Sequence, residues 1–486
     1  MMNFQDLRCD ALIANAWVAE AAGRRYTVTS PATGEVIASV ADCGAPEAAA
    51  ALRAATCAFP AWRDLTASQR AQFLMRWHAL LLEHREALAA LIVREQGKVL
   101  AESRGEVDYG ASYVQWFAEE ARRSYGMAIP EPVPGRRLLA TREPVGVVAL
   151  ITPWNFPFAM LARKIAPALA AGCTVVARPA EDTPLVALAM ADLAVRAGLP
   201  AGVLNVVPSS RERVQELTEV WMASEEVRKV SFTGSTAVGR KIAERATGTL
   251  KKVSLELGGN APFIVFEDAD LEAAVAGAVK AKFRNNGQTC VSPNRFLVHE
   301  AVYDEFAARL TQAVQQLVVG DPSDAGTQVG PLIHAGAVAK VGRHVQDAVT
   351  QGGQVLAGGA PVARPGCFFA PTVIAEAHTG MQLAQEETFG PVAALFRFHD
   401  EAQALQRAND TPYGLAAYFY TNDARRIWRV GRRLEAGMVG INEALISTEV
   451  APFGGIKQSG QGREGSWLGM DDYLEVKYLC IGGLDT

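Results

Sequence analysis

Hydrophobic positions near the start of the chain recur with the period of an amphipathic helix. The apolar residues that follow at steps of three, four or seven positions are Leu74, Trp77, Leu81, Leu88 and Leu91. That spacing places them on one face, and it predicts a single helix over residues 67–93. Similar patterns predict helices over 46–60 and over about 100–122.

The pattern changes after a proline-rich stretch over 129–135, which cannot continue a helix. An exposed strand is predicted over 138–141, and buried strands then alternate with helices. The predicted strands cover 145–151, 174–177, 202–207 and 230–232, and the helices cover 158–171, 184–197 and a stretch from about 237. Alternation of this kind is typical of a mostly parallel sheet with helices on both faces.

A second strand–helix series begins near residue 253, so we expect a domain boundary near 256. Its predicted strands cover 262–265, 295–298 and 393–398, and its helices cover 271–285, 301–318 and 337–351. A strand-like tail over 472–480 needs a partner, and a neighbouring subunit is the usual one. The length of 486 residues agrees with two or three domains.

Composition narrows the functional classes. The net charge of −5 favours neither a nucleic-acid partner nor an anionic membrane. The seven cysteines are odd in number and widely spaced, which indicates reduced thiols in a cytoplasm-like compartment. No His-x-x-x-His pair occurs, so we expect no catalytic zinc or other metal. The first ten residues do not resemble a signal peptide, and no apolar stretch reaches the ~20 residues of a membrane span.

Two residues offer covalent chemistry. Cys290 ends the run Phe-Arg-Asn-Asn-Gly-Gln-Thr-Cys, in which Gly287 breaks the preceding helix and places the cysteine on a turn. Glu256 interrupts an apolar strand and precedes Gly258 and Gly259. A lone carboxylate buried there would have a raised pKa and could act as a base, while a thiolate could attack a carbonyl. The alternatives are a buried structural cysteine and a paired structural glutamate.

Two loops offer binding groups. Asn155 lies in Thr-Pro-Trp-Asn-Phe-Pro, directly after a buried strand, where its amide could stabilise an oxyanion or simply bond its own backbone. Gly234 and Ser235 begin a helix after a strand, and a helix N-terminus can bind an anion. Alone, this second pattern is a weak phosphate signal because it lacks the Gly-x-Gly-x-x-Gly fingerprint.

Together with two further motifs, over 386–391 and 452–460, these segments resemble the aldehyde dehydrogenase superfamily across essentially the whole chain. The resemblance implies an α/β fold with a Rossmann-like cofactor domain, an α/β catalytic domain and a β oligomerisation arm. The implied division is a dinucleotide-binding domain over 1–121 and 144–255, a catalytic domain over 256–465, and an arm over 122–143 and 466–486. It also implies a homodimer or homotetramer.

The resemblance assigns catalytic roles to three residues. Cys290 attacks the aldehyde, the Asn155 amide and the Cys290 backbone N–H hold the oxyanion, and Glu256 activates the water that hydrolyses a thioester. The implied cofactor is NAD or NADP.

Eight residues are implied to bind this nucleotide. Lys164 and Glu181 would bind the adenosine ribose, and Ser235 the pyrophosphate. Glu387 would hold the nicotinamide ribose, with Phe389 beside it. The set is completed by Trp154, Arg178 and Gly234.

Within the superfamily, the chain most resembles succinate semialdehyde dehydrogenases, through 159–164, 282–285, 445–447 and 473–478. The resemblance implies that Arg163, Arg284 and Ser447 grip a distal carboxylate, which suits the bidentate geometry of arginine. We therefore expect oxidation of succinate semialdehyde to succinate, with glutarate semialdehyde as the alternative substrate. One methylene is worth only about 1–3 kcal/mol in a pocket, so sequence leaves this choice open.

Three positions depart from the family pattern. Arg178 replaces a usual lysine; Glu181 should repel a 2′-phosphate and favour NAD, but Arg178 could partly offset that repulsion. Ser292 replaces a second cysteine that some relatives carry, which removes a disulfide switch with the nucleophile. Residues 209–213 replace a Gly-Ser-rich stretch, for which the sequence gives no physical reason.

Three other functional classes remain as competitors. A CoA-acylating dehydrogenase would not need the base Glu256. A thiol hydrolase is disfavoured because no histidine lies in the cysteine motif. A non-catalytic role is disfavoured because the residues needed for the chemistry are all present.

Overall fold

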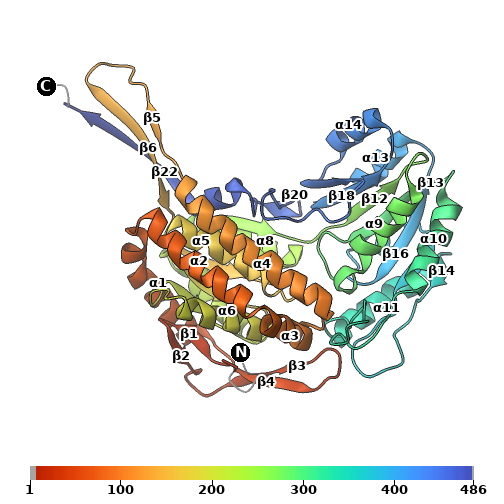
Figure 1. Ribbon diagram of the computed structural model, residues 1–486, viewed down its shortest axis with the longest axis horizontal. Coiled ribbons are helices and arrows are strands. Elements are labelled where there is room, and N and C mark those ends of the chain that lie inside the picture. Colours follow the sequence, from red (N-terminus) through yellow and green to blue (C-terminus); the bar gives the residue numbers. More distant parts are fainter. Residues whose placement is uncertain (1–6, 484–486) are drawn as a thin grey trace.

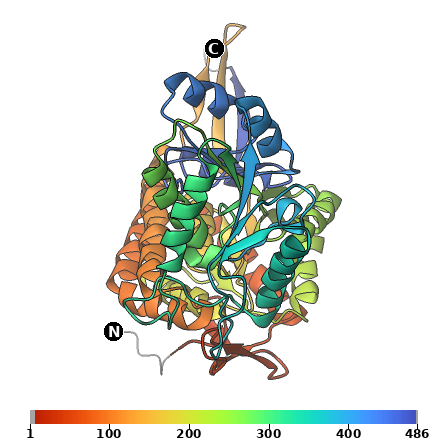
Figure 2. The ribbon, with the colours of Figure 1, turned by 90° about the vertical axis from the view of Figure 1, so that its right-hand side faces the viewer.

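The computed structural model describes residues 7–483, which form two α/β lobes and a projecting β arm (Figure 1). Residues 1–6, at the start of the first predicted domain, and residues 484–486, at the end of the predicted arm, lie outside the described part. Residues 1–6 are also most of the segment in which the sequence predicts no signal peptide. Figure 2 places the second lobe in front of the first, with the arm rising behind them. No helix of the described part is long and apolar enough to cross a membrane.

The first lobe is built on an eight-stranded sheet with the order β2-β1-β9-β8-β7-β10-β11-β21. The five central strands are parallel, whereas β1, β2 and β21 run antiparallel to their neighbours. The strands are β1 (Ala11–Ile13), β2 (Ala16–Val18), β7 (Val147–Ile151), β8 (Thr174–Arg178), β9 (Leu204–Val206), β10 (Val227–Thr233), β11 (Lys252–Glu256) and β21 (Gly460–Gln461). This arrangement confirms the predicted mostly parallel sheet.

Helices cover both faces of this sheet because its strands are apolar on both sides. Val148 and Leu150 of β7 face a core shared with α2, α4, α5 and α6, while Val147 and Ala149 face α1 and α7. The helices are α1 (Ala45–Arg63), α2 (Ala67–Glu83), α3 (Arg85–Gln96), α4 (Leu100–Glu120), α5 (Ala159–Ala171), α6 (Pro184–Arg196), α7 (Val214–Ala223) and α8 (Thr236–Ala246).

The single helix predicted over 67–93 is wrong. The chain leaves helical geometry at His84, which ends α2 and precedes α3 with φ −101° and ψ 16°. Helices α2 and α3, on either side of the break, both pack against α4 and α6. The hydrophobic spacing continues across the break, and for that reason the sequence did not reveal it.

The second lobe contains a seven-stranded sheet with the order β14-β15-β16-β13-β12-β18-β19. Its strands are β12 (Ala261–Val265), β13 (Pro293–His299), β14 (Gln354–Ala357), β15 (Thr372–Ala375), β16 (Val392–Phe398), β18 (Ala416–Tyr420) and β19 (Met438–Ile441). Its helices are α9 (Leu271–Phe283), α10 (Tyr303–Gln315), α11 (Ala335–Thr350), α12 (Gln382–Gln385), α13 (Glu401–Asn409) and α14 (Ala424–Arg433). Apolar cores lie on both faces of this sheet as well.

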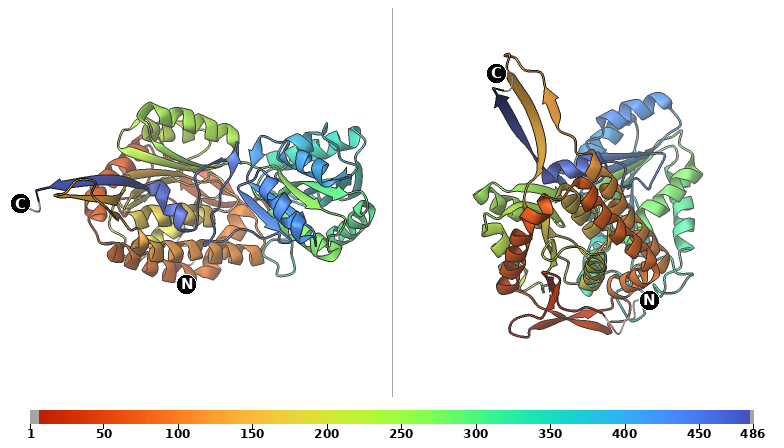
Figure 3. Two further views of the ribbon diagram at one scale, coloured as in Figure 1. Left: turned by 90° about the horizontal axis from the view of Figure 1, so that it is seen from above. Right: turned by 60° about the vertical axis from the view of Figure 1, so that its left-hand side comes forward.

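The arm is a three-stranded sheet with the order β22-β6-β5, and Figure 3 shows it projecting clear of both lobes. Strand β22 (Leu474–Gly482) pairs along its whole length with β6 (Arg136–Pro144), which also pairs with β5 (Met127–Ile129). The predicted C-terminal strand is therefore confirmed, and it is paired within its own chain. Large apolar side chains on the arm are nonetheless exposed, including Met127, Val476 and Tyr478.

Short elements complete the fold. They are the hairpin β3 (Arg25–Thr29) and β4 (Val36–Ala41), the pair β17 (Tyr413–Gly414) and β20 (Ile456–Lys457), and 3₁₀ turns over Ala121–Arg123, Thr247–Thr249, Arg284–Gly287 and Trp467–Tyr473.

The close packing of α4 on α5 predicts opposite effects at two glycines of α4. A Cβ at Gly110 would lie 2.4 Å from the buried Phe158 ring, whereas a Cβ at Gly105 would meet nothing within 4 Å. We expect Gly110→Ala to lower the free energy of unfolding by about 1–3 kcal/mol through overpacking. Gly105→Ala should raise it by roughly 0.5–1 kcal/mol because alanine favours the helix. Urea unfolding followed by circular dichroism measures both, and equal effects would contradict this account of the helix contact.

Candidate active site

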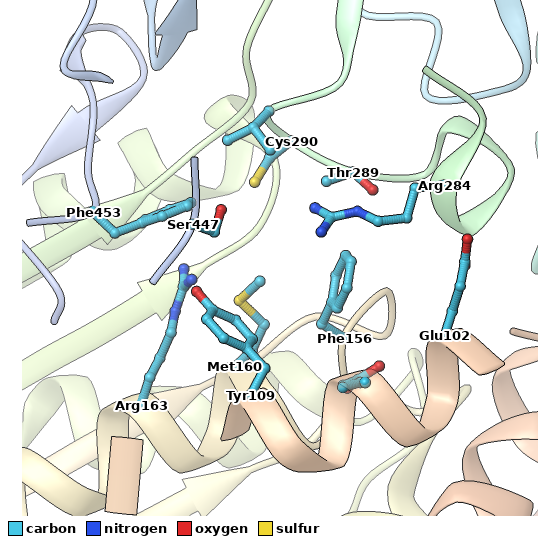
Figure 4. Close-up of a pocket in the computed structure, with 13 residues that line it drawn as sticks. Glu102, Tyr109, Phe156, Met160, Arg163, Arg284, Thr289, Cys290, Ser447 and Phe453 are labelled. Atoms are coloured by element: carbon cyan, nitrogen blue, oxygen red, sulfur yellow. The ribbon is translucent and has the colours of Figure 1, made fainter. Parts of the chain in front are cut away.

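A cavity of about 190 Å³ lies where α4 and α5 of the first lobe face the 284–291 segment of the second lobe (Figure 4). The surface of its lining is mostly apolar, but it contains a thiol, three hydroxyl groups, two guanidinium groups and the carboxyl groups of Glu102 and Glu106. The residues that define its chemistry are Arg163, Arg284, Thr289, Cys290, Ser447 and Phe453. A small, partly apolar molecule with an anionic end fits this chemistry.

Cys290 reaches the cavity through a tight backbone turn. Asn285, Asn286 and Gly287 have φ values of 49°, 54° and 73°, so three consecutive residues adopt left-handed conformations. Any Cβ at Gly287 would lie 2.2 Å from the Gly390 carbonyl oxygen, which only glycine avoids. The turn ends α9 and lets the sulfur of Cys290 point into the cavity, as Figure 4 shows.

The environment of Cys290 keeps its thiol protonated. Burial raises the pKa of the Cys290 thiol to about 12, although the Arg163 guanidinium acts in the opposite direction. The carboxyl groups of Glu387 and Glu256 add to the increase. The sulfur therefore needs a proton acceptor before it can attack a carbonyl.

Glu256 ends β11 and has the properties of such an acceptor. The residue is 3% exposed, and its Oε2 has no hydrogen-bond partner within residues 7–483. Burial raises the pKa of Glu256 well above its ordinary value, and the nearby Glu464 carboxylate raises it further. A buried carboxyl group with a free oxygen and a raised pKa is a stronger base than an exposed one and can take up a proton from a neighbouring group.

Asn155 is anchored beside the Cys290 turn. Its side-chain Nδ2 donates to the Gln288 carbonyl at 3.0 Å, and its own carbonyl accepts from Lys98 Nζ at 2.8 Å. The amide group carries two hydrogens, and the second makes no hydrogen bond within the described residues. Asn155 can therefore offer one N–H to a ligand without losing its anchor.

The structure brings the three residues predicted to hold a distal carboxylate into the cavity that contains Cys290. Arg163 lies over the Phe453 ring at 4.2 Å, and Arg284 lies over Phe156 at 5.5 Å. Ser447 lines the same wall as Phe453 (Figure 4). Stacking on an aromatic face restricts a guanidinium group while leaving its N–H edge available.

A second cavity, of about 380 Å³, lies on the first lobe and is lined by Trp154, Glu181, Ser210 and Arg211 among others. The Trp154 ring meets Phe389 edge to face, with 5.6 Å between their centroids. Four of the predicted nucleotide-binding residues therefore lie in one region. Trp154 and Glu181 line the cavity, Phe389 contacts Trp154, and Arg178 forms a 2.6 Å ion pair with Glu181.

Glu387 lies against the Gly258–Gly259 turn, where Gly259 N donates to its Oε1 at 3.3 Å. A Cβ at Gly258 would lie 2.9 Å from Glu387 Oε2, so this close approach requires glycine. Burial raises the pKa of Glu387 to about 7, which the cations Lys340 and Lys282 oppose. Ser235 caps α8 by accepting from Val238 N at 3.4 Å, which leaves the helix N-terminus facing outward.

Comparison with known proteins supports these assignments of fold and chemistry. The profile of the aldehyde dehydrogenase family matches residues 17–479. The chain belongs to the aldehyde dehydrogenase family. It is 55% identical to the NADP(+) succinate-semialdehyde dehydrogenase GabD of Escherichia coli, over 98% of each chain. It is 54% identical to a glutarate-semialdehyde dehydrogenase of Pseudomonas aeruginosa, again over 98% of each.

The fold agrees as closely. A crystal structure of succinate-semialdehyde dehydrogenase from Burkholderia pseudomallei superposes with a TM-score of 0.97 at 52% identity, covering 99% of this chain and 100% of that one. As a member of this family, the chain is an oxidoreductase that uses a pyridine nucleotide. No group of three or more metal-binding side chains gathers anywhere in residues 7–483.

One predicted nucleotide contact of this aldehyde dehydrogenase is wrong. Lys164 was expected to bind the adenosine ribose with Glu181, but its side chain is completely buried. Its Nζ donates to Ser231 Oγ at 3.0 Å and forms an ion pair with Glu464. Adjacent residues on a helix point about 100° apart, and here Arg163 faces the cavity while Lys164 faces the sheet.

Sequence reasoning also missed three residues of the site. Glu464, which pairs with Arg163 and Lys164, follows the predicted 452–460 motif by only four residues. Phe453 lies inside that motif, which was used only as a family marker. Lys282 lies in the 282–285 segment, which carries the resemblance but gives this lysine no role. Burial lowers the pKa of Lys282 to about 7, although the charge of Glu387 opposes this change.

Proposed function

We propose that this enzyme oxidises a small aldehyde that carries a distal carboxylate, and that succinate semialdehyde is its substrate. The supporting observation is the single cavity that holds Cys290 together with Arg163, Arg284 and Ser447. Glu102 and Glu106 also line this cavity, but Glu106 is paired with Lys98. The two guanidinium groups can therefore bind a distal carboxylate while the aldehyde carbon reaches the sulfur.

The protein groups divide the reaction between them. Glu256 takes the proton of the Cys290 thiol and releases it to solvent. The resulting thiolate adds to the carbonyl carbon and forms a thiohemiacetal, and the free Asn155 N–H with the Cys290 backbone N–H stabilises the oxyanion. A nucleotide whose nicotinamide end is held by Glu387 and Phe389 would supply the acceptor for the hydride of this carbon. Glu256 then takes a proton from water, the hydroxide attacks the thioester, and the C–S bond breaks to give the acid and free Cys290.

The second cavity and its surroundings fit the nucleotide. Trp154, Arg178 and Glu181 would hold its adenosine end, and Gly234 with Ser235 at the start of α8 would face its pyrophosphate. Glu387 and Phe389 would hold the nicotinamide end. In this proposal the first lobe is the dinucleotide-binding domain, with 1–121 and 144–255, and residues 256–465 form the catalytic domain.

Both NAD and NADP are proposed cofactors, and the geometry weakens the earlier preference for NAD. That preference assumed a free Glu181 carboxylate that would repel a 2′-phosphate. Arg178 instead neutralises it through the 2.6 Å ion pair, and Ser209 holds the Arg178 side chain in place. Arg211 lines the same cavity, and its charge also acts to lower the pKa of Glu181. Arg178 and Arg211 are therefore two cations that a 2′-phosphate could approach, beside the carboxyl groups of Glu181, Asp182 and Glu212 that also lie in this region.

Glutarate semialdehyde remains the second candidate substrate, because a relative that is 54% identical is named a glutarate-semialdehyde dehydrogenase. Hydrolysis is favoured over acyl transfer to CoA because Glu256 supplies a buried base with a free oxygen. A cofactor-free thiol hydrolase is disfavoured because burial holds Cys290 as a thiol, and no histidine lines the cavity.

The arm supports a proposed homodimer or homotetramer, built through residues 122–143 and 466–486. Val476 is 71% exposed and Tyr478 57% exposed, so one sheet face would leave large apolar groups in water. Burying such a face against a second copy would stabilise the assembly.

Substrate charge provides the main test of the proposed function. With NAD or NADP, kcat/KM should be higher for succinate semialdehyde than for glutarate semialdehyde, and lowest for butanal. Arg284→Ala should reduce kcat/KM for succinate semialdehyde by about tenfold to a hundredfold, since a charge-assisted hydrogen bond is worth roughly 1.5–3 kcal/mol. Butanal should lose little. Equal losses on both aldehydes would remove the carboxylate assignment.

Cofactor choice provides a second test. We expect Arg211→Ala to raise KM for NADP severalfold while KM for NAD stays nearly constant, because only NADP carries the extra phosphate. The measurement is initial rates with each nucleotide at saturating aldehyde. A change of the same size for both nucleotides would place Arg211 outside the phosphate-binding region.

The arm provides a third test. Val476→Asp places a charge on the exposed apolar face of β22 and should shift the protein to smaller species in light scattering coupled to size exclusion. Val318→Asp is the matched control, because Val318 is 51% exposed on the second lobe, away from the arm. An unchanged mass for Val476→Asp would argue against an interface through this face.

A further inference from the structure

The turn between α3 and α4 is packed tightly against the second lobe. Gly97 in this turn has φ 82°, and a Cβ there would lie 2.6 Å from the ring of Pro331, in the loop between α10 and α11. Gln96, at the end of α3, donates from its Nε2 to Asn285 Oδ1 at 3.0 Å. These contacts fix the backbone from which the next side chain, that of Lys98, extends toward the site.

Lys98 has a partner for each of its three N–H groups. Its Nζ forms an ion pair with Glu106 Oε2, donates to the Asn155 carbonyl at 2.8 Å, and lies 3.6 Å from the centre of the Phe156 ring. Both side chains of the ion pair are fully buried. An ammonium group held in this way has little freedom to move, so it fixes the carbonyl that it contacts.

The second oxygen of Glu106 holds the end of the same loop. Its Oε1 accepts from the backbone N–H groups of Phe158 and Ala159 at 2.9 and 3.2 Å. Both groups lie at the start of α5, where a backbone N–H has no partner within the helix and a carboxylate is favoured. One ion pair therefore anchors the loop over 152–158 twice, at Asn155 through the lysine and at α5 through the glutamate.

Asn155 is joined to the Cys290 turn from the opposite side. Asn285 Nδ2 donates to the Asn155 carbonyl at 2.9 Å and to the Gln288 carbonyl at 3.1 Å. The Gln288 carbonyl also accepts one hydrogen of the Asn155 side-chain amide. The Asn155 carbonyl thus receives Lys98 from one lobe and Asn285 from the other. These contacts decide where the second hydrogen of the amide points.

We propose that Lys98, held in place by Glu106, is a positioning residue that aims the free Asn155 N–H at the oxyanion formed when Cys290 attacks. The inference deepens the proposed function and rests on it, because that function gives Asn155 its role. Lys98 is buried behind the loop, so it acts through Asn155 and not on a reactant. A misplacement of about 1 Å in such a group can cost on the order of a hundredfold in rate.

The decisive variant combines Lys98→Met with Glu106→Gln. It removes both charges together, so neither is left buried alone, and the glutamine oxygen can still accept from the start of α5. We expect the first-turnover rate of nucleotide reduction, measured by stopped-flow absorbance, to fall by about tenfold to a hundredfold. KM for NAD and the preference for succinate semialdehyde over butanal should stay nearly constant. General damage to the fold would change all of these quantities.

A double-mutant cycle shows whether Lys98 acts through Asn155. Asn155→Ala alone should lower the first-turnover rate by about a hundredfold to a thousandfold, as expected for the loss of one oxyanion donor. Adding the paired variant to Asn155→Ala should lower the rate by no more than about threefold further, because residues that act as a unit are not additive. An ion pair that only stabilises the fold would instead multiply the two losses.

A second variant keeps the test independent of how well the paired variant folds. Glu106→Gln alone leaves Lys98 beside Asn155 but removes the charge that holds it. It should slow the first turnover severalfold, again without adding to Asn155→Ala. The matched control combines Arg85→Met with Asp108→Asn, because this ion pair also joins α3 to α4 but is partly exposed to solvent. The control should leave the rate unchanged.

The outcomes separate the inference from the proposed function. If Asn155→Ala leaves the first-turnover rate unchanged, the oxyanion role in the proposed function fails and the inference fails with it. If Asn155→Ala is slow but the paired variant is as fast as the wild type, Lys98 and Glu106 are structural residues and only the inference is overturned. Losses that multiply in the cycle lead to the same conclusion.

Discussion

Burial of the ionisable groups around the Cys290 cavity is the constraint on which the chemistry of this protein depends. Burial is the largest cause of the raised pKa of Cys290 and of Glu256, and of the lowered pKa of Lys282. Each group is thereby driven toward its uncharged form. The few charges that remain act strongly because little solvent screens them. A reactive sulfur can stay protonated until substrate and nucleotide complete the site.

The end of the cavity that would bind the distal carboxylate contains guanidinium groups instead of uncharged side chains. The guanidinium groups of Arg163 and Arg284 lie there against the aromatic faces of Phe453 and Phe156, and Glu464 forms an ion pair with Arg163. An uncharged aldehyde would leave a donor of Arg163 unpaired, and such a loss discriminates more strongly than a missing methylene does. Selectivity for charge and selectivity for chain length therefore have different physical sources.

The sequence predicted secondary structure and local motifs better than the orientation and partners of individual side chains. The spacing of apolar residues predicted both sheets, and the run ending at Cys290 predicted a residue that the structure places in the cavity, since those features depend on local pattern. The break at His84 was invisible because the apolar spacing continues through it. Lys164 was misplaced because helix geometry gives the angle between adjacent side chains but not which partner, sheet or cofactor, each of them meets. Glu464 was missed since its role requires Arg163, some three hundred positions away, which only the folded chain brings into contact.

The short segment over 456–461 belongs to both lobes at once. Strand β20 pairs with β17, which leads directly into the second sheet, and β21 pairs with β11 of the first sheet beside Glu256. These two strand pairings join the lobes next to Glu256. A large hinge opening between the lobes would break their hydrogen bonds. The two cavities, one lined by Cys290 and the other by Trp154 and Glu181, are therefore held at a fixed separation by the strand pairing between the lobes.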